Sequence, residues 1–190
     1  MMTSLRLTMF VAPVLALAVT AWLYVFFRKR AADTRLFRRF ILWVTGLAFI
    51  LNFIWEVSHC PLYKGGAYKL NHLPLLALAS LADAIQVDLL YFGFALVYRN
   101  GRWVHPLTAV RVFWLMLVGG TGAIVFELAH LSAGNWAYTD SMPLIPGLGV
   151  GVSPVLQFMV LPVLAYCLST YLAAPKPVPS SHAISGGRPA

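Results

Sequence analysis

The sequence predicts an all-α, polytopic membrane helix bundle with five transmembrane helices, an external N-terminus and a cytoplasmic C-terminus. Of its 190 residues, 60% are hydrophobic and only 11% are charged, whereas soluble domains average about 25% charged residues. This composition excludes a disordered chain, an ordinary nucleic-acid-binding domain and almost any soluble globular fold. We therefore expect membrane lipids, and not nucleic acid, as partners.

Five segments approach or exceed the length of about 20 mostly apolar residues that a membrane-spanning helix needs. They are Thr8–Phe27, Phe40–Val57, Leu73–Tyr98, Leu107–Leu131 and Val152–Leu172. The first segment continues past its alanine-rich stretch to a basic stop, which favours a retained helix over a cleaved signal peptide. We expect residues 1–172 to form the transmembrane domain and the Pro-, Ser- and Gly-containing tail 173–190 to be disordered in the cytoplasm.

The lysines and arginines predict the orientation, because cytoplasmic loops of membrane proteins carry an excess of both. One side of the predicted topology has Arg6, Lys64 and Lys69. The other side has Arg28, Lys29, Arg30, Arg35, Arg38, Arg39, Arg99, Arg102, Lys176 and Arg188. The net charge of +8 is therefore mainly a topology signal, and we expect a multi-pass protein of the bacterial inner membrane.

Four of the six acidic residues lie inside predicted spans: Glu56, Asp83, Asp88 and Glu127. A charged group at the bilayer centre costs about 3 kcal/mol on insertion scales, so such residues face a bundle interior or a cavity. The topology places Glu56, Asp83 and Glu127 in the outer half of the membrane. For Asp88, an ion pair with Arg111 between the third and fourth helices is a structural alternative.

Helical spacing brings further polar residues to the same faces. Asn52, Glu56 and His59 are spaced i, i+4, i+7, and Glu127 and His130 share a face with two small residues, Gly120 and Ala123. These faces predict a polar pocket that opens outward. The expected substrate-binding residues are Asn52, Trp55, Tyr63, Trp136, Tyr138 and Gln157. As alternatives, Asn52 and Gln157 could serve only as interhelical hydrogen-bonding residues, and Trp136 and Tyr138 as an interfacial aromatic belt.

The first chemistry that these residues suit is acid–base catalysis on a hydrophobic isoprenoid or lipid. A carboxyl group in an apolar pocket can stay protonated and act as a general acid, and aromatic faces stabilise developing positive charge. The catalytic candidates are Glu56 as the acid, with Asp83 or Glu127 as the complementary base.

The stretch Asn52-Phe53-Ile54-Trp55-Glu56, followed by Pro61-Leu62-Tyr63, resembles the Asn-x-x-Trp-Glu region of small integral-membrane terpene cyclases of the paxilline and pyripyropene type. The resemblance covers about a dozen residues. It implies an enzyme that uses intramembrane carboxyl groups to protonate an epoxide or alkene, with cyclase, lyase or isomerase activity.

A metal site is the second hypothesis, because Glu56-Val57-Ser58-His59 and Glu127-Leu128-Ala129-His130 are both Glu-x-x-His motifs. Two such motifs on neighbouring helices are part of the di-iron pattern of helix bundles. The metal ligands would be Glu56, His59, Glu127 and His130, with a divalent metal or di-iron centre as the cofactor of a membrane oxidoreductase.

The third hypothesis is not catalytic. A pocket of acids and histidines open to one side could bind a lipid or pigment, or the chain could be an assembly subunit of a membrane complex.

Overall fold

The computed structural model describes residues 11–66 and 70–174, and within them it contains five long helices and no strand. The helices are α1 (Val11–Arg30), α2 (Thr34–His59), α3 (Leu73–Val97), α4 (Ala109–Ser132) and α5 (Val152–Ala173), and two short 3₁₀ turns span Cys60–Leu62 and Leu70–His72. All five long helices are sufficiently long and apolar to cross a membrane, with mean hydropathy of 1.6 to 1.9. The five predicted spans are thus confirmed as helices. In the predicted tail, residues 175–190 lie outside the described residues.

Helix α2 begins at Thr34, earlier than the apolar run that predicted it. The Asp33 side chain accepts hydrogen bonds from the backbone N–H groups of Arg35 and Leu36, both at 2.9 Å. A cap of this kind satisfies N–H groups that have no partner in the first turn. The arginines that follow are good helix formers, so the helix extends beyond the part that hydropathy detects.

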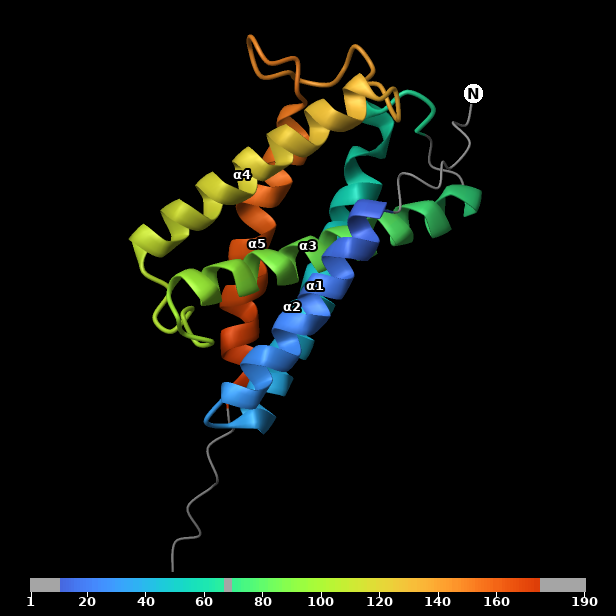
Figure 1. Cartoon of the computed structure of the whole chain (residues 1–190). Coiled ribbons are helices and arrows are strands. Elements are labelled where there is room, and N and C mark those ends of the chain that lie inside the picture. The colour runs from blue at the N-terminus through green and yellow to red at the C-terminus, as the bar shows by residue number, and fades with distance from the viewer. Residues whose placement is uncertain (1–10, 67–69, 175–190) are drawn as a thin grey trace, which may run out of the picture.

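The five helices form a bundle in which α3 runs across the direction of the others (Figure 1). Helix α2 packs against α3 and α5, α1 packs mainly against α3, and α4 packs against α5. Helix α3 crosses α1 and α2 obliquely in this view. We call the end where α2 and α4 end and α5 begins the polar end. The opposite end, where α1 ends and α2 begins, is the arginine-rich end, with Arg28, Arg30, Arg35, Arg38 and Arg39.

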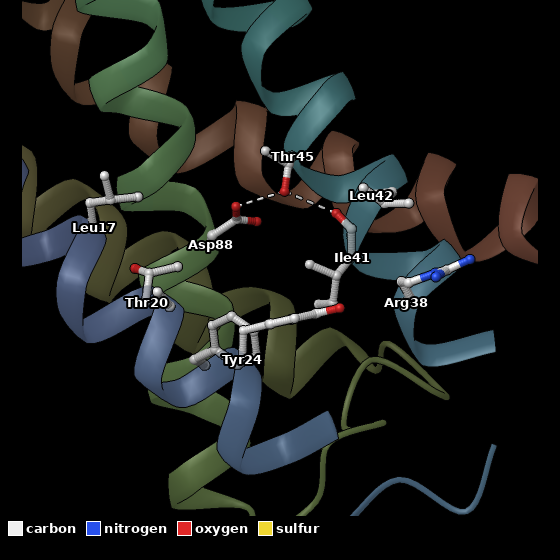
Figure 2. A pocket seen from close by; sticks show the side chains of 10 residues that line it. Leu17, Thr20, Tyr24, Arg38, Ile41, Leu42, Thr45 and Asp88 are labelled. Atoms are coloured by element: carbon white, nitrogen blue, oxygen red, sulfur yellow. Dashed lines mark hydrogen bonds between the residues drawn. The ribbon is translucent and has the colours of Figure 1, made fainter. Parts of the chain in front are cut away.

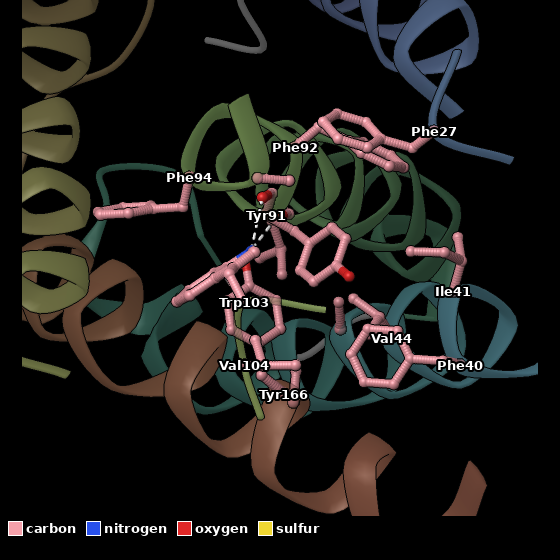
Figure 3. Packing of buried hydrophobic residues seen from close by; sticks show 14 of the residues in the cluster. Phe27, Phe40, Ile41, Val44, Tyr91, Phe92, Phe94, Trp103, Val104 and Tyr166 are labelled. Carbon is pink, nitrogen blue, oxygen red and sulfur yellow. Dashed lines mark hydrogen bonds between the residues drawn. The ribbon is translucent and has the colours of Figure 1, made fainter. Parts of the chain in front are cut away.

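The aromatic part of the core lies between α2, α3, α5 and the connecting segment 98–108 (Figure 3). Trp103 of this segment is fully buried, and its indole N–H donates to the carbonyl oxygen of Tyr91 at 3.0 Å. The Tyr91 hydroxyl donates in return to the Gly101 carbonyl. The Trp103 ring also stacks on Phe94 and meets Tyr166 edge-on. The connection between α3 and α4 is therefore part of the core.

The structure contradicts the alternative that Asp88 and Arg111 form an ion pair. Asp88 accepts a hydrogen bond of 2.7 Å from the Thr45 hydroxyl. The Arg111 guanidinium donates instead to the carbonyl oxygens of Trp103 and Pro106 and lies 5.0 Å from the centre of the Tyr98 ring. Arg111 is in the first turn of α4, so its long side chain reaches back to the segment that precedes the helix.

Helices α4 and α5 approach each other closely at two glycines of α4. A Cβ atom on Gly119 would lie 2.2 Å from the carbonyl oxygen of Phe158, and one on Gly120 would lie 2.9 Å from the Met159 side chain. Small residues allow this approach between helices. It brings the face of α4 that carries Glu127 toward the first turns of α5.

Candidate functional site

Polar side chains from three helices meet near the polar end of the bundle. The group that we call the polar cluster consists of Asn52, Trp55, Glu56 and His59 of α2, Asp83 of α3, and Ser153 and Gln157 of α5. Asn52, His59 and Gln157 are buried, and Glu56 is 17% exposed. The helical spacing of Asn52, Glu56 and His59 thus places them on one inward face, as the sequence predicted.

Gln157 is the centre of the polar cluster. Its side-chain nitrogen Nε2 lies 2.8 Å from Oδ1 of Asn52, 3.0 Å from Oδ2 of Asp83 and 3.2 Å from Oε1 of Glu56. The Asn52 amide is held in turn, because its Nδ2 donates to the carbonyl oxygen of Ala48 at 2.7 Å. One amide therefore joins two carboxyl groups from different helices.

His59 forms a second arm of the polar cluster. Its Nε2 lies 3.2 Å from Oε1 of Glu56, and its Nδ1 lies 2.9 Å from the Ser153 hydroxyl. The Trp55 indole donates to the same hydroxyl at 3.2 Å. A neutral His59 with its proton on Nε2 satisfies all these groups, because it donates to Glu56 and accepts from Ser153.

Glu127 lies in a neighbouring group with residues of the loop between α4 and α5. Its side chain is 5% exposed, and its Oε2 accepts hydrogen bonds from the Tyr138 hydroxyl and from the Trp136 indole. The Trp136 ring stacks on His130 with 4.3 Å between ring centres. Tyr138 and Trp136 therefore hold the carboxyl group of Glu127 in place.

The Tyr63 ring lies between the two groups. It meets His59 of the polar cluster at 5.3 Å between ring centres, and it also meets Tyr138 at 5.4 Å and Trp136 at 6.3 Å. Burial raises the pKa of the Tyr63 hydroxyl well above its usual value, and the nearby Glu127 adds to this effect. Burial and the hydrogen bond to Glu127 likewise raise the pKa of Tyr138. Both hydroxyls are therefore protonated donors at neutral pH.

Backbone hydrogen bonds position the loop between α4 and α5 over the end of α2. The Lys64 N–H donates to the Ala137 carbonyl at 2.8 Å, and the Thr139 N–H donates to the Leu62 carbonyl at 2.9 Å. Tyr63 and Tyr138 thus form an isolated antiparallel bridge. This short pairing aligns the aromatic side chains with the ends of the two helices.

The polar side chains of both groups bond mainly to one another. Two cavities of the described structure lie elsewhere, one of about 340 Å³ between α1, α2 and α3 and one of about 140 Å³ between α4 and α5. Neither is lined by a residue of the polar cluster. The outward-opening pocket stays a prediction.

The two Glu-x-x-His motifs have different surroundings. Glu56 and His59 contact each other, but Nδ1 of His130 pairs with Asn135 at 2.7 Å and its ring stacks on Trp136 and Phe126. Among the residues that the structure describes, no group of three or more His, Cys, Asp or Glu side chains could hold a metal ion. The metal site therefore stays a prediction without a geometric observation to support it.

Nearly all the site residues expected from the sequence belong to the polar cluster or to the group around Glu127. His130 adjoins the group around Glu127 through its stack on Trp136. Ser153 was not among the expected site residues, although the helical spacing predicts that it shares a face of α5 with Gln157, one turn earlier. A serine on an apolar helix matches no catalytic motif. In the structure its hydroxyl joins Trp55 and His59, two residues of another helix.

Comparison of the chain with models of known protein families, with curated protein sequences and with solved structures finds no match in any of the three.

Proposed function

We propose that this protein is a membrane enzyme that acts on a hydrophobic isoprenoid or lipid by acid–base chemistry. One observation carries the proposal: carboxyl groups from α2, α3 and α4, namely Glu56, Asp83 and Glu127, lie in two side-chain groups that both contact the Tyr63 ring. Buried acids are rare in membrane spans and are functional candidates by default.

Glu56 and Asp83 form the acid in this proposal. Both accept from the Gln157 amide nitrogen, so their carboxyl groups lie close together. In the proposed reaction this pair carries one proton, because two adjacent negative charges inside a membrane span are unfavourable. Glu56 delivers that proton to a carbon of an alkene, or to the oxygen of an epoxide, and a carbocation forms on the substrate.

Glu127, in the group that adjoins the polar cluster at Tyr63, acts as the base. It takes a proton from a carbon adjacent to the cationic centre, so that a new double bond forms and the net reaction is an isomerisation or a cyclisation. The faces of Tyr63 and Trp136 stabilise the cation by cation–π attraction, worth up to about 2 kcal/mol when desolvated. The substrate enters by displacing contacts between these aromatic rings.

The arginine distribution supports a placement in a bacterial inner membrane with the arginine-rich end on the cytoplasmic side. The polar end then lies on the side of the membrane away from the cytoplasm. The substrate would accordingly come from the bilayer. The metal-dependent oxidoreductase and the non-catalytic lipid-binding or assembly subunit stay predictions from the sequence.

Deuterium exchange tests the proposal across many candidate lipids at once. Purified protein is reconstituted with an isoprenoid-rich lipid extract in D₂O, and lipids are analysed by mass spectrometry for deuterium bound to carbon. We expect at least one lipid to gain deuterium with the wild-type protein. General acid–base groups contribute about 10²–10⁴-fold to rates, and the Glu56→Gln variant should lose exchange by that factor.

The matched control is Asp140→Asn, which removes an exposed loop carboxyl and should exchange like the wild type. Exchange at the wild-type rate in Glu56→Gln would exclude Glu56 as the acid. Absence of any exchange above protein-free vesicles would refute the acid–base function as a whole.

A further inference from the structure

A second buried carboxyl group, Asp88, lies apart from the polar cluster. Asp83 and Asp88 are five residues apart on α3, which separates them by about 7.5 Å along the helix and by about 140° around it. Asp83 therefore faces Gln157, whereas Asp88 faces the cavity of about 340 Å³ between α1, α2 and α3. We call this cavity the α1–α3 pocket.

Only one of the two carboxyl oxygens of Asp88 has a hydrogen-bond partner among the described residues. Figure 2 shows the carboxyl group pointing from α3 into the space between α1 and α2, with Thr45 opposite. Its Oδ2 accepts from the Thr45 hydroxyl at 2.7 Å, but its Oδ1 has no hydrogen-bond partner within the described chain. The residue is 6% exposed. An unpartnered carboxylate oxygen in such a place is costly to bury, so it indicates a group that the chain itself does not supply.

Thr20 of α1 is a second buried polar residue that lacks a hydrogen-bond partner among the described residues. It lines the α1–α3 pocket and is 8% exposed. Two unpartnered polar side chains from different helices thus border one cavity. Its volume falls within the range of about 300–1,000 Å³ typical of small-molecule sites.

The mouth of the pocket determines where a ligand would come from. Leu17 of α1 and Leu42 of α2 line it and are 51% and 66% exposed, so on a membrane-spanning bundle they face lipid. Arg38 lines the side nearer the arginine-rich end, about 10 Å along α2 from Thr45. A ligand that reaches Asp88 this way is dissolved in the bilayer.

We propose that the α1–α3 pocket binds a bilayer-dissolved molecule that has an apolar body and one hydrogen-bond donor, a hydroxyl or an amine. The donor meets Oδ1 of Asp88, and the apolar body lies along the leucines at the mouth. The site is separate from the acid–base function proposed above and rests only on the membrane placement of the five helices.

Photolabelling tests this site on the full chain reconstituted in lipid nanodiscs. The probe is a medium-chain alcohol that carries a diazirine, and labelled peptides are identified by mass spectrometry. We expect label on the α1 and α2 residues that line the pocket, with decanol and decylamine competing and decane competing much less. Stronger competition by the amine identifies a protonated amine as the preferred donor, whereas stronger competition by the alcohol identifies a hydroxyl.

Two variants make the result specific. Asp88→Asn replaces an acceptor oxygen by a donor and should reduce labelling about tenfold, equivalent to about 1.4 kcal/mol. Ala21→Phe fills the pocket from an exposed position on α1 and should reduce labelling even if the first variant folds poorly. Gln86→Ala, on the same helix but outside the pocket and outside the polar cluster, should label like the wild type.

Unchanged labelling of the pocket residues in folded Asp88→Asn or Ala21→Phe protein would overturn the proposal. Equal competition by decane would also overturn it, because the probe would then be partitioning into apolar surface without use of the carboxyl group.

Discussion

Single residues in this protein matter through the partners that they join. Gln157 is one side chain, yet it contacts Asn52, Glu56 and Asp83 from two other helices. Intramembrane amides can be simple interhelical hydrogen-bonding residues, and the sequence left this alternative open. The structure shows that Gln157 does join helices and that two of its acceptors are the carboxyl groups of the proposed acid.

Gln157→Leu should destabilise the protein, because it leaves two carboxyl groups and an amide oxygen without their shared donor. Loss of a partner for a buried polar group costs about 1–3 kcal/mol, and we expect a lower unfolding temperature in detergent. The control is Gln86→Leu, a half-buried glutamine of α3 outside the polar cluster. Equal unfolding temperatures for the two variants would show that the Gln157 contacts contribute little to stability.

Individual helices position these residues through their lengths and their close contacts. Helix α2 contributes four residues to the polar cluster near its end, and α5 contributes two near its start. Helix α4 can present Glu127 beside them because Gly119 and Gly120 let it pack tightly on α5. Gly120 lies on the Glu127 face, and the structure identifies α5 as the helix that packs against it.

Gly119→Ala tests this helix contact. The added methyl group would lie 2.2 Å from the backbone oxygen of Phe158, which cannot move aside as a side chain could. Overpacking of this kind costs about 1–3 kcal/mol, so the variant should unfold at a lower temperature than the wild type.

Gly122→Ala is the matched control, because no atom lies within 4 Å of the position of its added methyl group. An alanine at Gly119 that is tolerated as well as one at Gly122 would mean that α4 and α5 are not in close contact.

At the scale of the whole molecule, the bundle separates two chemically different ends. The polar end contains Glu56, Glu127, His59 and the aromatic loop, whereas the opposite end has the arginines at the end of α1 and the start of α2. This polarity matches the charge rule for membrane topology. It predicts which end is accessible from each side of the membrane.

Cysteine labelling of intact cells tests the orientation. In a background with Cys60→Ser and Cys167→Ser, Asp140→Cys should react with a membrane-impermeant maleimide, because the proposed topology places the polar end outside the cytoplasm. Arg35→Cys at the opposite end should react only after the membrane is permeabilised. Both positions are exposed, so access to the reagent depends on the side of the membrane. The reverse pattern would invert the proposed topology.

The sequence alone determined the number of long helices and their apolar character. It also determined which helix faces carry Asn52, Glu56, His59 and Glu127. These properties depend on local composition and on the 3.6-residue helical period. Only the tertiary structure decided which faces meet. The oblique crossing of α3 brings Asp83 to Gln157, the loop pairing brings Tyr138 to Glu127, and Arg111 bonds to backbone carbonyls instead of Asp88. Such contacts depend on helix crossing and loop geometry, which no local pattern encodes.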